Sequence, residues 1–296
     1  MSDIRDCDHI QHADILALNF IRRDAPYVFR RHFRTGLRSR IIEVLETDAV
    51  ARETEGVMVD GVRCFPRARP TKMLRIFRTR FADLEQGLRE TRRLKRVERW
   101  LAPMFVAASQ EFYVDYCCGG RRQILLCGLQ DHVHGAALDP WQASRAGYLE
   151  QLYRRLVDET GTRMKAASFQ KRFRASLEAF VAAVRGLMDR ERVLPDLAGV
   201  RNLVVDADSR LRLVDINNIQ DLALGDAVAL DDKGYPVLDK SIEALDLLAF
   251  HFLGRRDLRD DGLIGCFFTP ERRTQVEAVA RRFAPPGSME KFGSRS

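Results

Sequence analysis

Two short apolar runs around a polar turn constrain the fold of this chain more than any other stretch. The runs are LVV at residues 203–205 and LRLV at residues 211–214, and the turn between them is DADSR at residues 206–210. Runs rich in Val and Leu on either side of an Asp- and Ser-containing turn are typical of a β-hairpin. We therefore predict an antiparallel strand pair over residues 203–214.

Polar side chains stand at the open end of this predicted hairpin. Asn202 immediately precedes the first strand, and Asp215 immediately follows the second. Because the ends of an antiparallel pair lie side by side, we expect the two side chains to be neighbours. Amide and carboxylate oxygens are ligands that Mg²⁺ accepts alongside phosphates. Asp196, a few residues upstream, can approach the same end, although an ordinary hairpin with solvated acidic ends has the same pattern.

This stretch resembles the protein kinase superfamily. In that family a catalytic loop containing Asp ends in Asn, a strand pair follows, and the Asp of a DFG triplet completes the metal site. The interval from Asn202 to Asp215 is the family's interval, and Asp215-Ile216-Asn217 stands in place of the triplet. The resemblance places Asp196 as the catalytic residue and Asn202 with Asp215 at the metal. No HRD precedes Asp196, and Leu197 occupies the usual position of the catalytic Asp.

A second motif lies in the first half of the chain. The alternating run KMLRIFR at residues 72–78 predicts a strand, and apolar residues at 81, 84, 88, 94, 97 and 101 predict a helix after it. A basic strand residue and a helix Glu hold the nucleotide phosphates in kinases. The sequence of this strand and helix is similar to that of bacterial lipopolysaccharide (Kdo) kinases. This resemblance implies that Arg75 takes the place of the phosphate-anchoring Lys and that Glu90 takes the place of its partner Glu. Arg75 departs from the family's Lys, and a surface charge pair is the alternative interpretation.

A possible hinge and two helices extend the resemblance. Residues 112–115 and 123–129 read as strands, and QDHVHGAAL at residues 130–138 then resembles the kinase hinge, with Val133 beside the adenine. Apolar residues at helical spacing predict a long helix over residues 168–190 and another over residues 239–253. Both predicted helices stand where the large kinase lobe has helices.

Residues 56–65 contain Asp60-Gly61 between β-formers, which predicts a tightly turned hairpin. In a kinase this would be the first strand pair, whose turn covers the phosphates, but the usual turn is richer in Gly. A plain hairpin is therefore the favoured interpretation.

The resemblance divides the chain into an extension at residues 1–50, a small lobe at 51–131 and a large lobe at 132–296. The extension is rich in Arg interleaved with aromatic residues. We expect it to be helical, with its aromatic side chains packed on the fold and its arginines solvated. A surface for anionic lipid or nucleic acid is the competing interpretation, and no nucleic-acid motif supports the second of these.

Composition bounds the partners and the compartment. The 296 residues carry a net charge of +7, which indicates an acidic partner such as a nucleotide, an anionic glycolipid or a membrane surface. Six cysteines without CxxC spacing indicate a reduced, intracellular protein, and the polar start of the chain is unlike a signal peptide. The longest apolar run is too short to cross a bilayer. We expect a cytoplasmic chain, working at the inner face of the membrane.

Together these features predict an α+β, two-lobed protein-kinase-like fold. The implied activity is ATP- and Mg²⁺-dependent transfer of phosphate to a hydroxyl of lipopolysaccharide or another sugar. The missing HRD, the Arg at the Lys position and the altered DFG triplet point to the alternative, a catalytically inactive pseudokinase that serves as a binding or regulatory module.

Overall fold

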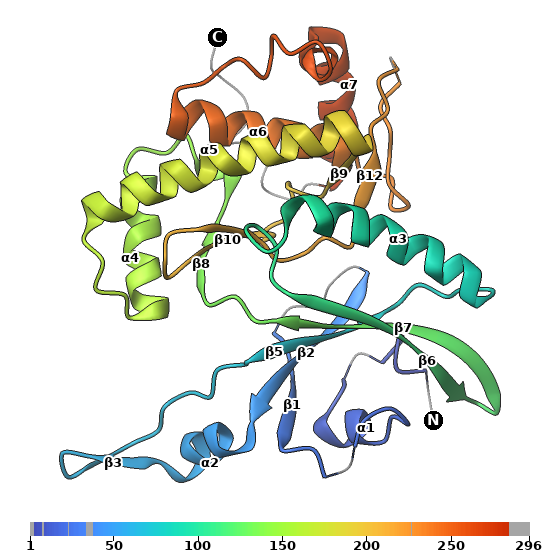
Figure 1. The fold of residues 1–296 in the computed structure, drawn as a ribbon, viewed down its shortest axis with the longest axis vertical. Coiled ribbons are helices and arrows are strands. Elements are labelled where there is room, and N and C mark those ends of the chain that lie inside the picture. Colours follow the sequence, from blue (N-terminus) through green and yellow to red (C-terminus); the bar gives the residue numbers. More distant parts are fainter. Residues whose placement is uncertain (1–2, 8, 23, 34–37, 226, 284–296) are drawn as a thin grey trace. The chain divides into compact units, whose positions relative to one another are not determined.

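A computed structural model describes residues 3–7, 9–22, 24–33, 38–225 and 227–283 of the chain. It is a mixed α+β protein, rich in sheet toward the N-terminus and in helix toward the C-terminus (Figure 1). The chain divides into two compact units: Met1–Arg93 with Ala107–His132, and Leu94–Val106 with Val133–Ser296. Among the described residues, no helix is long and apolar enough to cross a membrane.

The first unit is built on a five-stranded antiparallel sheet with the order β1-β2-β5-β7-β6. Its strands are β1 (Tyr27–Arg31), β2 (Ser39–Glu46), β5 (Lys72–Phe77), β6 (Ser109–Cys118) and β7 (Arg121–Asp131). The sequence predicted β5, β6 and β7. Helix α3 (Leu84–Leu101) follows β5, as the apolar spacing predicted, and its residues up to Arg93 belong to this unit.

The expectation of a helical extension at residues 1–50 is wrong. Strands β1 and β2 lie within this range and are integral to the sheet, because β2 pairs with β1 on one side and with β5 on the other. The prediction assumed that the arginines of this segment are solvated, but a buried carboxylate neutralises one of them. Arg30 on β1 donates to Glu43 on β2 at 2.9 Å, and Glu43 is only 4% exposed. Short helices α1 (His12–Leu16) and α2 (Thr47–Glu55) flank the two strands.

Alternation along the strands gives the sheet two different faces. One face buries aliphatic residues, Leu74 and Ile76 among them, against the N-terminal segment through Ile4, Ile10, Ile15 and Leu18. The opposite face carries Arg75, Glu111 and Tyr113. There the Tyr113 hydroxyl bonds to Thr91 on α3 at 3.1 Å.

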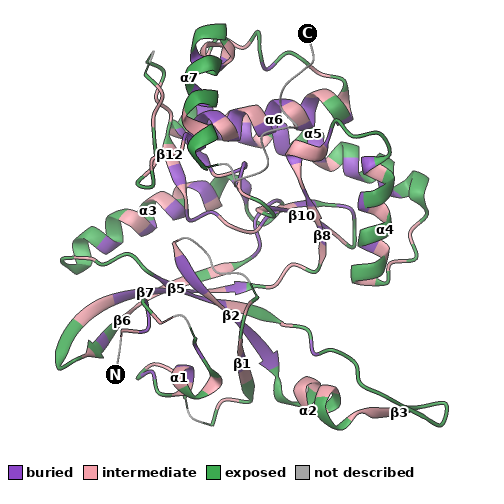
Figure 2. Cartoon of the chain, turned by 180° about the vertical axis from the view of Figure 1, so that it is seen from behind, coloured by how far each residue is buried: buried purple, intermediate pink, exposed green. Residues whose placement is uncertain are grey.

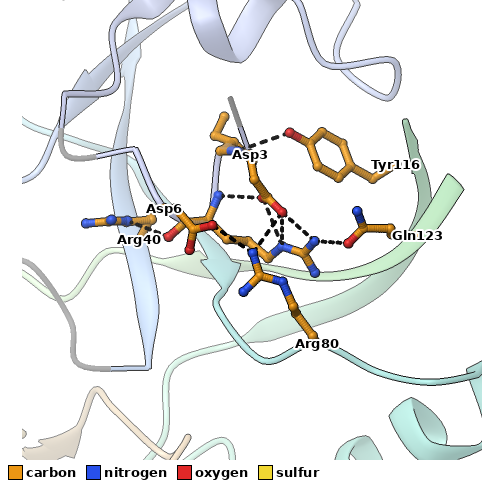
Figure 3. A network of polar contacts seen from close by, with 8 residues as sticks. Asp3, Asp6, Arg40, Arg80, Tyr116 and Gln123 are labelled. Atoms are coloured by element: carbon orange, nitrogen blue, oxygen red, sulfur yellow. Dashed lines mark hydrogen bonds and ion pairs between the residues drawn. The ribbon is translucent and has the colours of Figure 1, made fainter. Parts of the chain in front are cut away.

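The N-terminal segment is held to the sheet by the polar network of Figure 3. The fully buried guanidinium of Arg5 donates to Asp3 at 2.6 Å and also to Gln123 on β7. Arg80 bridges Asp3 and Asp6, the latter at 2.7 Å. Because a buried guanidinium is costly without partners, these contacts fix where the segment lies.

Residues 56–65 form the predicted hairpin, from β3 (Val57–Val59) and β4 (Val62–Cys64). Asp60 and Gly61 both have positive φ, as a tight Asp-Gly turn requires. The hairpin is a separate two-stranded sheet and not the first strand pair of the five-stranded one. The turn of that first pair, between β1 and β2, includes residues 34–37, which lie outside the described part of the chain.

The second unit combines helices with two small sheets. Strands β8 (Gly135–Leu138), β10 (Leu203–Asp206) and β11 (Leu211–Leu213) form one sheet, and β9 (Val193–Pro195) with β12 (Ile219–Asp221) form the other. The predicted hairpin is therefore confirmed as β10–β11. Its helices are α4 (Tyr148–Thr160), α5 (Ala166–Glu191), α6 (Val237–Leu253) and α7 (Pro270–Ala280), with 3₁₀ turns η1 (Pro140–Gln142), η2 (Gly265–Phe268) and η3 (Arg281–Phe283).

Helices α5 and α6 provide the centre of this unit's core, as their apolar spacing predicted. Figure 2 shows α6 as a predominantly buried ribbon. Phe173, Phe180 and Val184 on α5 and Leu245 and Leu248 on α6 are all fully buried in one cluster with the apolar residues of β10 and β11. This packing fixes the hairpin whose open end carries Asn202 and Asp215.

Candidate functional site

Two strand pairs bring Asp196, Asn202 and Asp215 together in the second unit. The amide of Val214 donates to the carbonyl oxygen of Asn202 at 2.9 Å, so Asn202 and Asp215 lie at the same end of the β10–β11 hairpin. Asp196 follows β9 directly, and its amide donates to the carbonyl oxygen of Asn218 at 2.9 Å, beside the start of β12. The predicted convergence of these three residues on one end of the hairpin is thus present in the structure.

The loop from Asp196 to Asn202 is closed by its own side chains. Oδ1 of Asp196 accepts hydrogen bonds from the amides of Ala198, at 3.0 Å, and Gly199, at 2.9 Å. Nδ2 of Asn202 donates to the carbonyl oxygen of Asp196 at 2.9 Å. A Cβ atom on Gly199 would lie 2.3 Å from that Nδ2, so glycine is needed to admit the Asn202 side chain. The amide group of Asn202 is therefore fixed, with Nδ2 committed to the loop.

Leu197 shows why Asp196, one position earlier than the family pattern, carries the carboxylate. Leu197 is fully buried, and its amide donates to Oγ of Ser241 on α6 at 3.0 Å. A charged residue at this position would enter the apolar core, which is strongly unfavourable. Asp196 is half-buried beside the loop amides instead.

The residues after Asp215 combine a turn with an apolar anchor. Oδ1 of Asp215 accepts a hydrogen bond from the amide of Asn217 at 3.0 Å. Ile216 between them is fully buried in the core of the second unit. The altered triplet therefore keeps a carboxylate at the hairpin end and a large apolar side chain directed into the core.

Neighbouring carboxylates make the site strongly acidic. Burial raises the pKa of Asp196 above its ordinary value, and the negative charges of Asp215 and Asp231 raise it further, whereas the loop amides oppose the change. Burial likewise raises the pKa of Tyr235, and the charge of Asp196 adds to that effect. Excess negative charge of this kind favours a bound cation.

Asp231 and Tyr235 were not identified from the sequence. Oδ1 of Asp231 accepts hydrogen bonds from the amides of Lys233 and Tyr235, each at 2.9 Å, which shapes a tight turn. The run DDKG at residues 231–234 was a recognisable turn pattern. The pattern gave no indication that the turn lies near Asp196.

A lysine side chain also lies near the loop. Nε1 of Trp141 donates to the carbonyl oxygen of Ala198 at 3.3 Å, and Nζ of Lys240 lies 4.4 Å from the centre of the Trp141 ring. Lys240 also pairs with Glu243 on the same helix. Trp141 thus links a lysine on α6 to the loop that begins at Asp196.

The first unit places Arg75 differently from expectation. Its Nη2 atom lies 3.2 Å from Oε1 of Glu111 on β6 and 2.9 Å from Oγ of Ser109. Glu90 makes no ion pair with any described residue, so the expected Arg75–Glu90 pair is not formed in this structure. Arg75 reaches Glu111 instead because Gly128 on β7, which stands between them in the strand register, has no side chain to block the contact.

Val133 completes the set of residues predicted from the sequence, and Lys72 lies on the same strand as Arg75. Lys72 is exposed and pairs with Asp131 at 2.5 Å, and alternation along β5 puts it on the sheet face opposite Arg75. Val133 is half-buried in the connection from β7 to β8, where the chain returns to the second unit. The residues after it form a strand and not an irregular hinge, because Gly135–Leu138 pairs with β10.

Few oxygen ligands for a divalent cation stand at the open end of the β10–β11 hairpin. The described residues contain no group of three or more His, Cys, Asp or Glu side chains arranged to hold a metal. The donor set at the hairpin end is instead one carboxylate, Asp215, and one amide, Asn202, beside the acidic Asp196. Such a set fits Mg²⁺, which is commonly held by one or two protein carboxylates together with substrate phosphates and waters.

Comparison with known proteins found no family model that matches the chain and no match among curated proteins.

Proposed function

We propose that this chain is an ATP- and Mg²⁺-dependent phosphotransferase with a protein-kinase-like fold. The observation that carries the proposal is the convergence of Asp196, Asn202 and Asp215 on one end of the β10–β11 hairpin. A kinase catalytic loop and the metal-binding Asp that follows it have the same order along the chain.

Each side chain of the site has a role that its surroundings suit. Asn202 would offer Oδ1 to Mg²⁺, because its Nδ2 already donates to the loop. Asp215 would supply the charged ligand. The metal would neutralise charge on the nucleotide phosphates. Asp196, whose pKa is raised, would orient an acceptor hydroxyl and take its proton.

The arrangement of the first unit supports the same proposal. Arg75 lies on the third strand of the five-stranded sheet in chain order, and α3 follows that strand, as the phosphate-anchoring Lys and its helix do in protein kinases. Tyr113, on the Arg75 face of the sheet, bonds to Thr91 on α3. Arg75 is accordingly our candidate for binding phosphate, with Glu111 as the carboxylate that positions it, and Val133 our candidate for contacting the adenine.

The acceptor is proposed to be a hydroxyl of an anionic glycolipid such as lipopolysaccharide. The net charge of +7 favours an anionic substrate. With that acceptor, the chain would act at the cytoplasmic face of a membrane.

A pseudokinase is the second candidate, and the Arg75–Glu111 pair is the observation that favours it. Both side chains are at most 4% exposed, so the guanidinium is occupied by protein groups. A guanidinium that stays in this ion pair cannot bind a phosphate. In that case the acidic site would bind a cation or nucleotide without turnover.

Thermal melting with nucleotide tests the proposal. A ligand that binds only the native state at 100 times its Kd stabilises that state by about 2.7 kcal/mol. We expect ATP with Mg²⁺ to raise the Tm of the wild type, and ATP with EDTA to raise it less. The increase should be lost in Asp215→Asn and kept in Asp208→Asn, which changes a carboxylate in the turn at the far end of the same hairpin. A wild-type Tm that does not change when ATP and Mg²⁺ are added would refute nucleotide binding.

A further inference from the structure

The β3–β4 hairpin exposes large apolar side chains on both of its faces. Met58 is 61% exposed, Val62 64% and Phe65 60%. In the strand register Met58 lies opposite Arg63, and Val59 lies opposite Val62. One face therefore carries Met58, Arg63 and Phe65, and the other carries Val57, Val59, Val62 and Cys64.

The fold of the first unit gives these side chains no place to be buried. Strands β3 and β4 form a sheet of their own and pack chiefly against each other. Figure 2 shows the hairpin beyond α2 largely in the colour of exposed residues. A two-stranded hairpin alone is only marginally stable in water, and single exposed apolar residues are common whereas clusters mark contact surfaces. The hairpin is therefore suited to an apolar medium outside this chain.

The charges beside the hairpin select the kind of surface. Residues 57–69 carry three exposed arginines and a single acidic residue, Asp60, and the exposed Glu55 stands just before the hairpin. Nη1 of Arg63 donates to the carbonyl oxygen of Glu55 at 2.8 Å. The arginines are Arg63, Arg67 and Arg69. Asp60 is at the tip of the turn, where deep insertion into hydrocarbon would strip it of water. A shallow position, with apolar side chains below the headgroups and arginines among them, satisfies all of these groups.

We propose that the β3–β4 hairpin docks on an anionic lipid surface, with Met58 and Phe65 inserted at the boundary of the acyl chains and Arg63, Arg67 and Arg69 bound to the lipid phosphates. This docking extends the proposed function, because it would hold the chain where a membrane-borne acceptor is found. It requires neither ATP nor turnover, so it can be tested without either.

Vesicle flotation in the absence of nucleotide is the test. The full chain should float with phosphatidylcholine vesicles that contain phosphatidylglycerol and not with pure phosphatidylcholine, and added salt should weaken the binding. The double variant Met58→Ser/Phe65→Ser should bind at least 10-fold more weakly. Met104→Ser is the matched control, because Met104 is a methionine in the second unit with a similar exposure of 59%.

A second pair of variants tests the charges. Replacing Arg63, Arg67 and Arg69 with Gln should abolish the preference for anionic vesicles. Replacing Lys171, Arg172 and Arg174 on α5, which are also exposed, removes the same charge from the second unit and should leave that preference in place. All variants concern exposed side chains, and far-ultraviolet circular dichroism verifies that each is folded.

Three results would overturn the proposal: no flotation of the wild type with anionic vesicles, equal flotation of Met58→Ser/Phe65→Ser, or equal losses in the two charge variants. Light scattering provides an independent outcome. A dimer that forms without lipid and is lost in the hairpin variants would assign this surface to a second copy of the chain. Failure of the ATP-dependent melting shift alone would reject the phosphotransferase and leave the docking intact.

Discussion

Arg75 and Glu111 form a buried ion pair across an intervening strand, with Nη2 of the arginine 3.2 Å from Oε1 of the glutamate. Both residues stand level with Gly128 in the sheet, Arg75 on one side and Glu111 on the other. A Cβ on Gly128 would lie 3.4 Å from Nε and Nη2 of Arg75, so any side chain larger than Ala would obstruct the pair. The glycine thus allows a cation on β5 to reach a carboxylate on β6.

Glu111→Ala should destabilise the protein strongly, because it leaves the guanidinium of Arg75 buried without its carboxylate. Loss of one partner of a buried pair costs about 3–5 kcal/mol in the free energy of unfolding. Urea denaturation followed by circular dichroism measures this loss. Asp115→Ala is the matched control on the same strand, because Asp115 pairs with Arg122 in solvent and should contribute less than about 1 kcal/mol. Equal losses of unfolding free energy in the two variants would show that the buried pair stabilises the protein no more than the exposed pair does.

Gly135→Ala should disrupt the sheet that supports the candidate site. An added Cβ would lie 2.1 Å from the carbonyl oxygen of Val205, so β8 must move away from β10. Overpacking of this kind costs about 1–3 kcal/mol or more. Gly262→Ala is the control, because nothing lies within 4 Å of the corresponding Cβ position. A Tm for Gly135→Ala that equals the control's would contradict the close strand approach.

Elements with a clear apolar period could be predicted from the sequence. The β10–β11 hairpin, β5, α5 and α6 all follow local patterns of alternation or helical spacing, and Asn202 and Asp215 come together because a hairpin fixes its own ends. These predictions need only neighbouring residues.

Buried charges and long-range contacts limited how much of the remaining structure could be predicted from the sequence. Glu43 and Arg75 occupy interior positions that a hydropathy pattern assigns to the surface, and pairing with an opposite charge on another strand makes them tolerable there. For the same reason Glu111 was missed as the partner of Arg75, since their contact depends on the strand order of the sheet. Asp231 acts on Asp196 through a loop whose course no local pattern indicates.

Asp196→Asn should raise the stability of the protein at neutral pH. The native-state pKa of Asp196 is raised above its ordinary value of 3.8, mainly by burial and then by Asp215 and Asp231. The native state therefore binds a proton that the unfolded state has released, and stability falls as pH rises from 3.8 through the native pKa. Asn cannot ionise, so the variant avoids that loss and can still accept from the loop amides.

Urea denaturation at neutral pH and again below pH 3.8 measures the difference between wild type and Asp196→Asn. The advantage of the variant should be present at neutral pH and should shrink on acidification. Asp208→Asn, which changes a carboxylate in the exposed turn of the neighbouring hairpin, is the control. A wild type that is more stable than Asp196→Asn at neutral pH would contradict the raised pKa.

Asp215→Asn and Asp196→Asn should separate metal binding from proton transfer. Asp215 provides the full negative charge at the hairpin end, and Asn retains its shape without that charge. Asp215→Asn should therefore lose both the Mg²⁺-dependent Tm increase with ATP and phosphate transfer. Asp196→Asn should keep the Tm increase and lose about 100-fold or more in turnover, because removal of a general base typically costs that much. Asp208→Asn should retain both properties.

Phosphate release and transfer to lipopolysaccharide-type acceptors, measured for wild type and these three variants, give the comparison. In the proposed mechanism a bound metal stabilises the charge of the transferred phosphoryl group, so turnover of ATP should require Asp215. Turnover that survives Asp215→Asn would place the metal elsewhere and reject the site. A wild type that binds ATP and Mg²⁺ yet gives no phosphate release, with the Arg75–Glu111 pair intact, would favour the pseudokinase.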